Sequence, residues 1–75
     1  MDIDAIGRRV RSERKQLGLR QDEFASLVGI GTRFLSELEN GKPTLEIGRV
    51  LRVLDALGLE VQVHRRSPFP KEQDS

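Results

Sequence analysis

The chain has 75 residues, a formal net charge of +1 and no cysteine, which leaves room for one small domain and excludes disulfide bridges and thiolate metal sites. A domain this small buries only about 60% of the surface of its unfolded chain, so association with a second copy would help to stabilise it. Since no apolar run approaches the roughly 20 residues that cross a bilayer, and the acidic N-terminus lacks the apolar core of a signal peptide, we expect a cytoplasmic protein that binds no membrane.

The first predicted helix covers residues 3–17, and Gly18 follows it as a stop. Its apolar stripe has helical spacing and consists of Ile3, Ile6, Val10 and Leu17. Between residues 8 and 20, six basic residues accompany a single acid, Glu13. Such a run is either a solvated helix face or a surface for an anionic partner.

Two shorter helices are predicted next, over about 21–28 and 32–40. Their apolar faces consist of Phe24, Leu27, Val28, Phe34, Leu35 and Leu38. Only residues 29–31 separate the two helices, and Ala25 is a small residue at the place where they come closest. Two short helices joined by a glycine-bearing turn of this length are typical of a helix-turn-helix.

A fourth helix is predicted after Pro43, with the Thr44 hydroxyl as its N-cap. The pattern then changes, because Leu59, Val61 and Val63 alternate with polar residues, which predicts one short half-buried strand. A strand needs a hydrogen-bonded partner and the chain offers no second strand, so we expect the same strand of a second copy to pair with it across a two-fold axis. The alternative is an extended segment that packs on its own helices.

The elements form one domain over residues 1–66, followed by a tail over 67–75 that is predicted to be disordered because it is polar and contains two prolines. His64 is the only histidine, which excludes a multi-histidine metal site. No nucleophile–base arrangement or pair of carboxylates in a cleft is recognisable, so we expect no enzymatic activity, no metal and no cofactor.

The order Gln21, Ala25, Gly29, Leu35 and Glu39-Asn40-Gly41 is much more specific than a single glycine pattern. Residues 17–57 resemble the Xre/Cro family of helix-turn-helix repressors. The segment GIGTRFLSELENGKPTLEIGRVLRVLDALGL most resembles the HipB-like and Y4mF-like antitoxin branch, and the resemblance extends over roughly residues 5–63. It implies an all-α, lambda-repressor-like bundle of about four helices with the short C-terminal strand paired across a dimer, in which the third helix enters the major groove of DNA.

The resemblance also implies which residues read the bases. On the face of the third helix opposite its core leucines, the candidates are Thr32, Arg33, Ser36 and Glu37. Arg33 is the strongest, because its planar guanidinium can donate twice to one guanine. Glu37 either accepts a hydrogen bond from a cytosine amino group or excludes wrong sequences.

Candidate phosphate contacts flank this helix. Gln21 lies at the start of the second helix, and Gly31 lies just before the third. The turn after the third helix contributes Asn40, Gly41 and Lys42. The remaining candidates are three exposed arginines, Arg9, Arg11 and Arg20. Gly31 also serves as the N-cap of the third helix and lets the backbone approach DNA closely. Many relatives carry a capping threonine where this chain has Arg20, which leaves the start of the second helix open.

One charged pair has a structural role in this interpretation. Arg14 and Glu39 both lie on the core sides of their helices, and a buried charge requires a partner. The resemblance implies that they pair and connect the first helix to the third.

Together these residues predict a repressor that binds a palindromic site in double-stranded DNA as a homodimer, with Leu59, Val61 and Val63 in the dimer contact. The branch resemblance implies the antitoxin of a HipBA-like toxin–antitoxin system, which represses its own operon and binds a HipA-like kinase toxin. Two alternatives stay open. A stand-alone Xre-family regulator would share nearly all of these residues, and the net charge of +1 permits a protein-interaction module that barely binds DNA.

Overall fold

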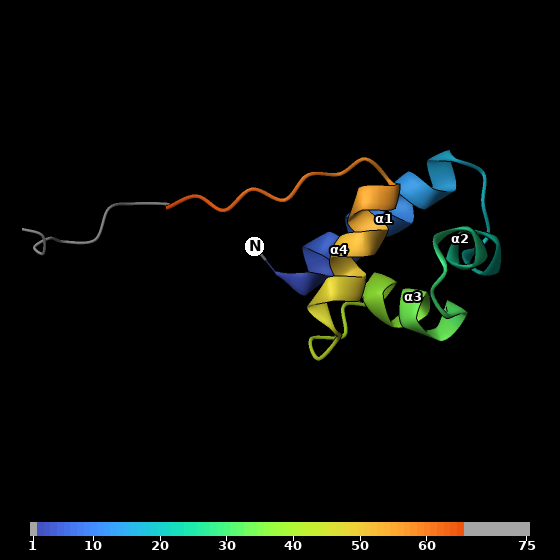
Figure 1. Ribbon diagram of the computed structural model, residues 1–75, viewed down its shortest axis with the longest axis horizontal. Coiled ribbons are helices and arrows are strands. Elements are labelled where there is room, and N and C mark those ends of the chain that lie inside the picture. Colours follow the sequence, from blue (N-terminus) through green and yellow to red (C-terminus); the bar gives the residue numbers. More distant parts are fainter. Residues whose placement is uncertain (1, 66–75) are drawn as a thin grey trace, which may run out of the picture.

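The computed structural model describes residues 2–65. Within this range it contains four helices and no strand (Figure 1). The helices are α1 (Ile3–Gln16), α2 (Gln21–Val28), α3 (Thr32–Glu39) and α4 (Ile47–Ala56). None of them is long and apolar enough to span a membrane. The all-α prediction is confirmed, and the tail predicted for 67–75 lies outside the described residues.

Acidic side chains fix the starts of the first two helices. At α1, the Asp2 carboxylate accepts a hydrogen bond of 2.7 Å from the Ala5 N–H. At α2, the Glu23 carboxylate accepts one of 2.8 Å from the backbone N–H of Arg20, the residue at the N-cap. This hydrogen bond is one half of a capping box. It places the start of α2 at Gln21 although Arg20 lacks the oxygen of a capping threonine.

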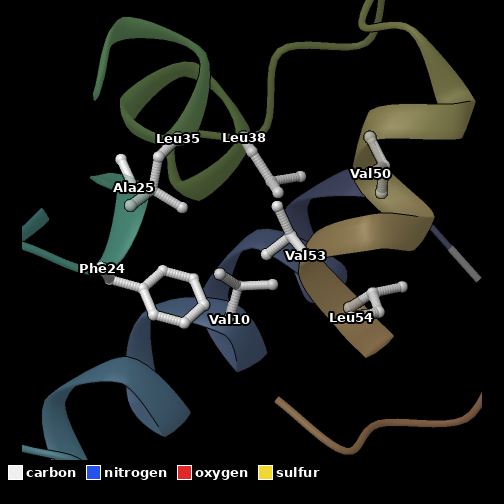
Figure 2. Close-up of a cluster of buried hydrophobic side chains, with 8 residues drawn as sticks. All are labelled: Val10, Phe24, Ala25, Leu35, Leu38, Val50, Val53 and Leu54. Atoms are coloured by element: carbon white, nitrogen blue, oxygen red, sulfur yellow. The ribbon is translucent and has the colours of Figure 1, made fainter. Parts of the chain in front are cut away.

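All four helices contribute side chains to one core (Figure 2). It consists of Val10, Phe24, Ala25, Leu35, Leu38, Val50, Val53 and Leu54. Each such valine, leucine or phenylalanine contributes about 1.5–3 kcal/mol by leaving water. The prediction that Leu27 joins this core is wrong, because its side chain is 74% exposed. Phe24, Ala25 and Val28 already form the inward face of α2, and Leu27 lies on another side of this short helix.

Gly7 sets the distance between α1 and α3. This residue is buried, and a Cβ atom placed on it would overlap the carbonyl oxygen of Leu38 and lie 3.0 Å from that of Glu39. The backbone of α1 therefore packs directly on the carbonyl groups at the end of α3. Any side chain larger than hydrogen at this position would push the two helices apart.

The start predicted for α4 is wrong. Thr44 is not its N-cap, because Pro43 and Thr44 lie in a turn and the helix begins three residues later, after Glu46. The turn allows Leu45 to pack against the core before the helix starts. The Glu46 carboxylate contacts Arg49 of the first turn at 3.1 Å and makes no capping hydrogen bond.

Residues 59–65 follow α4 without regular secondary structure, so the predicted strand is not formed within the single chain. Leu59 packs against the core, whereas Val61 and Val63 are 42% and 88% exposed. Beyond its first residues the segment leads away from the four helices (Figure 1). The physical reason is the one that the sequence suggests: within the described residues, no second strand offers hydrogen-bond partners to this backbone.

Candidate nucleic-acid interface

A tight turn holds α2 and α3 together. Gly29 has a φ of +81°, in the left-handed region that favours glycine, and its N–H donates to the Ala25 carbonyl at 2.9 Å. The Ile30 N–H donates to the same carbonyl at 3.0 Å, and the Ile30 side chain packs against the core. Ala25 itself is only 1% exposed. These contacts close the helix-turn-helix with no room for a larger side chain at Ala25.

The outward face of α3 is polar, and we call its four residues, Thr32, Arg33, Ser36 and Glu37, the reader face. Thr32 and Arg33 are exposed, and Ser36 and Glu37 are half-buried. On the inward face, Leu35 and Leu38 have no exposed surface. The structure therefore brings the four predicted base-reading residues together on one side of a helix whose other side is fixed in the core.

The carboxylate of Glu37 connects the reader face to the turn after α3. One of its oxygens, Oε2, lies 3.3 Å from the Arg33 Nε and 3.3 Å from the Lys42 Nζ. The hydrogen bond from Lys42 holds the pKa of Glu37 below its ordinary value, and the charges of Lys42 and Arg33 act in the same direction. In the free protein this carboxylate is thus ionised and contacts two cations.

The turn after α3 contains three predicted phosphate contacts. Asn40 caps the helix, and its side-chain amide donates to the Ser36 carbonyl at 2.9 Å. Gly41 has a φ of +80°, and a Cβ atom there would overlap the Asp4 carboxylate of α1. Lys42 completes the turn and reaches Glu37. The structure therefore places Asn40, Gly41 and Lys42 beside the reader face.

Glu39 accepts hydrogen bonds from two directions on the inner side of α3. The Arg14 guanidinium donates to both of its oxygens, at 2.6 and 2.9 Å, and the Gln21 amide donates to one of them at 3.0 Å. A third Arg14 hydrogen bond of 2.7 Å goes to the Leu19 carbonyl. Arg14 is 6% and Glu39 8% exposed, so this bidentate pair is buried and connects α1, α2 and α3.

Opposing effects set the protonation of Glu39. Burial raises the pKa of its carboxyl group, but the hydrogen bonds from Arg14 and Gln21, with the charges of Arg14 and Arg11, outweigh burial and hold it below the ordinary value. The hydrogen bond to Glu39 in turn raises the pKa of Arg14. Both groups are therefore charged. The Gln21 amide, which we predicted to contact a phosphate, donates to the Glu39 carboxylate.

The three arginines predicted to contact phosphate have different surroundings. Arg9 pairs with Glu13 at 2.8 Å and lines a groove with Ile6, Leu54 and residues 59–62, which is not part of the reader face. Arg20 folds back onto Asp22, at 3.1 Å, and its hydrogen bond lowers the pKa of that carboxyl group.

Arg11 differs from the other two. It forms no ion pair within residues 2–65, and it lies near enough to Glu39 for its charge to lower the pKa of that carboxyl group. Of the three arginines, Arg11 is thus the one that lies close to the end of α3 and has no ion pair in the described part of the chain.

Gly31 occupies the N-cap of α3 with ordinary extended backbone, φ −74° and ψ 147°. A Cβ atom added to it would meet nothing within 4 Å. Neither the backbone nor the packing of the described chain therefore requires glycine at this position.

Sequence reasoning missed the close contact at Gly7 and the contact between Arg49 and Phe34. A glycine in the middle of a helical pattern, on the same stripe as Ile3, Val10 and Arg14, is the signal that could have revealed the first. The Arg49 guanidinium lies 5.8 Å from the centre of the Phe34 ring, beside the reader face. No spacing in the sequence indicates this second contact.

Among residues 2–65, no group of three or more histidine, cysteine, aspartate or glutamate side chains is arranged to hold a metal ion. The His64 ring contacts the Gln62 side chain at 3.0 Å.

The comparisons with known proteins agree with this geometry. The chain matches the helix-turn-helix family over residues 10–63, a range that includes α2, α3, α4 and the turns between them. It is 52% identical, over 58 residues, to the uncharacterized HTH-type transcriptional regulator y4mF of Sinorhizobium fredii (strain NBRC 101917 / NGR234). The aligned region covers 77% of this chain and 76% of that protein. On these matches, and with the turn and the two helices in place, the chain belongs to the helix-turn-helix family.

Proposed function

We propose that the protein binds double-stranded DNA as a transcriptional regulator, with α3 in the major groove. The observation that carries the proposal is the division of α3 into a polar reader face and a fully buried leucine face. A major groove admits one helix, and side chains at its outward positions can reach the base edges. The family match and the relative named as a transcriptional regulator support the same function.

Within this proposal the reader face supplies sequence recognition. Arg33 contacts Glu37, but its side chain is 89% exposed and can extend toward a guanine and donate twice to it. Thr32 and Ser36 offer hydroxyl groups to either kind of base pair. Glu37 accepts from the amino group of a cytosine.

The flanking residues supply contacts to the phosphates. Lys42 and the backbone of the turn at Asn40 and Gly41 lie on one side of the reader face, and the start of α2 at Gln21 lies near the end of α3 through Glu39. Arg11 is the best placed of the three arginines, because its charge acts on Glu39 at the end of α3, whereas Arg9 lines the groove at residues 59–62 and Arg20 folds back onto Asp22.

The protein acts as a homodimer in this proposal, with residues 59–64 of two copies paired as antiparallel strands. Its support is a groove that this segment forms with α4, lined by Leu51, Leu54, Leu59 and Val61 together with Asp55 and Glu60. A second copy would cover exposed Leu51 and Val61 and supply the missing strand partner. Two reader helices would then lie about 34 Å apart, one turn of DNA. The variant Val61→Pro removes a pairing N–H, and a dimer of undiminished strength in that variant would argue against this arrangement.

The finer proposal is that this regulator is a repressor of its own operon and the antitoxin of a HipBA-like system. Its support is the resemblance of residues 29–59 to that branch. Coexpression with the product of the adjacent gene tests it: a stable complex with a kinase-like protein supports the antitoxin role, and repeated absence of a complex leaves a stand-alone regulator.

Fluorescence anisotropy tests the DNA proposal itself. The probes are the duplex upstream of the protein's own coding sequence and a scrambled duplex of equal composition, each at two salt concentrations. Tight binding that prefers the upstream duplex and weakens steeply with salt supports a sequence-specific regulator. Weak binding without preference would favour a protein-interaction module instead.

A further inference from the structure

Glu37 is an unusual residue for a surface that meets DNA. Its carboxylate repels phosphates, yet it belongs to the reader face, at the end nearer the turn after α3, and its side chain is only 27% exposed. One oxygen of this carboxylate, Oε2, contacts both Arg33, the strongest base-reading candidate, and Lys42, a phosphate-contact candidate. Two cations with different proposed roles on DNA thus share one internal anion.

We propose that Glu37 is a specificity-determining residue that competes with DNA for Arg33 and Lys42. Its carboxylate pairs with both cations until a duplex of the correct sequence takes its place as their partner. This inference rests on the proposed DNA binding. Any duplex can offer phosphates to Lys42. Only a duplex with the right bases offers both a guanine to Arg33 and a cytosine amino group to Glu37. On other sequences, when Arg33 or Lys42 leaves Glu37 to contact DNA, the Glu37 carboxylate faces the major groove with no amino group to donate a hydrogen bond to it.

The geometry of the two contacts supports exchange. Both distances are 3.3 Å, longer than the 2.6 Å between Arg14 and Glu39, and the Arg33 and Lys42 side chains are 89% and 46% exposed. Pairs this open to water are weak and separate readily. Glu37 itself is the most enclosed of the three groups, so the cations leave while the carboxylate stays.

The variant Glu37→Gln tests the inference, because glutamine keeps the size of the side chain and removes its charge. Its binding to the upstream and scrambled duplexes is measured by anisotropy at several salt concentrations. Two freed cations should strengthen binding to the scrambled duplex by about tenfold at 0.1 M salt and steepen the salt dependence by about one to two phosphate contacts. Binding to the upstream duplex should change by less than about threefold, so that the preference between the duplexes falls.

Glu13→Gln is the matched control. Glu13 has the same exposed fraction, 27%, and also pairs with an arginine four residues away, but it lies on α1 and its partner, Arg9, lines the groove at residues 59–62. It should leave both affinities nearly unchanged. An equal gain in the two variants would overturn the inference, because net charge alone would then explain the result.

A second variant tests whether Lys42 carries the gain. In a Lys42→Ala background, Glu37→Gln should strengthen scrambled-duplex binding by clearly less than it does alone. An undiminished gain would exclude competition for Lys42.

The outcomes separate this inference from the proposed function. If the parent protein binds neither duplex, both fail. If the parent prefers the upstream duplex and Glu37→Gln keeps that preference and the salt dependence, the regulator stands and the role of Glu37 is refuted.

Discussion

Glu37 and Glu39 lie two residues apart on α3, and each contacts an arginine, but their surroundings differ completely. Glu39 accepts two short hydrogen bonds from Arg14 and is 8% exposed, whereas Glu37 makes two contacts of 3.3 Å on the outer side of the helix. A buried charge that loses its partner has no water to replace it, while an exposed one is rehydrated at once. One short helix thus carries a permanent ion pair on its inner side and exchangeable ones on its outer side.

Removing the inner pair should produce the largest effect. Arg14→Ala leaves the Glu39 carboxylate buried without its main partner, and we expect a loss of about 3–5 kcal/mol in the free energy of unfolding. Urea denaturation followed by circular dichroism measures it. The matched outer variant, Arg33→Ala, should change stability by less than about 0.5 kcal/mol. Similar losses in the two variants would remove the distinction between the sides of α3.

Acid should weaken the Arg14–Glu39 pair over the pH range in which Glu39 becomes protonated. Because the folded protein lowers the pKa of Glu39 below its ordinary value of 4.5, the ionised carboxylate stabilises the fold above that pH, and this contribution is lost as the pH falls through the lowered pKa. Urea midpoints measured from about pH 6 down to pH 3 should therefore fall more steeply in the parent than in Glu39→Gln. Parallel curves would mean that Glu39 does not contribute to the acid sensitivity.

On the outer side, the expected effect is on DNA. Arg33→Ala should weaken binding to the upstream duplex by about 1–3 kcal/mol and relax the preference at one base pair, because its bidentate contact to guanine is lost. Anisotropy with single-base variants of the duplex measures both quantities. Equal weakening on the scrambled duplex would assign Arg33 to a phosphate instead.

The smallest effect on stability is expected at Gly31, the N-cap of α3, which belongs to neither the inner nor the outer side of the helix. Gly31→Ser adds a capping hydroxyl in open space, so it should raise the free energy of unfolding by a few tenths of a kcal/mol. If the backbone at Gly31 approaches a phosphate, the same variant should bind both duplexes less tightly. Unchanged affinity would show that DNA leaves room for a side chain at this position.

The helices could be predicted because their signals are local. Apolar spacing, Gly18 and Gly29 determined α1 and α2 nearly to the residue, and the positions of Arg14 and Glu39 on their helices placed both on the inner side. The start of α4 could not, because a threonine after a proline is a good N-cap in isolation. Packing of Leu45 against the core decided otherwise.

The reader face was accessible to sequence reasoning for the same reason, since a helix with two core leucines has only one other side. Apart from the pair of Arg14 and Glu39, which the family resemblance implied, the partners of polar side chains could not be predicted. Arg9 and Arg20 are paired with nearby acids, and Gln21 reaches Glu39, a residue 18 positions away. Such choices depend on the distances between helices, which no spacing in the sequence encodes.

The contact at Gly7 has a consequence for redesign. Because α1 lies against the backbone carbonyls of α3, and Leu35 and Leu38 are buried in the core, the direction of the third helix does not depend on its outward side chains. Positions 32, 33, 36 and 37 can therefore be randomised together in a library, and the variants should present their new side chains along an unchanged axis. Selection on different DNA targets would then change the base preference while the orientation of α3 stays fixed, provided that residue 7 remains glycine.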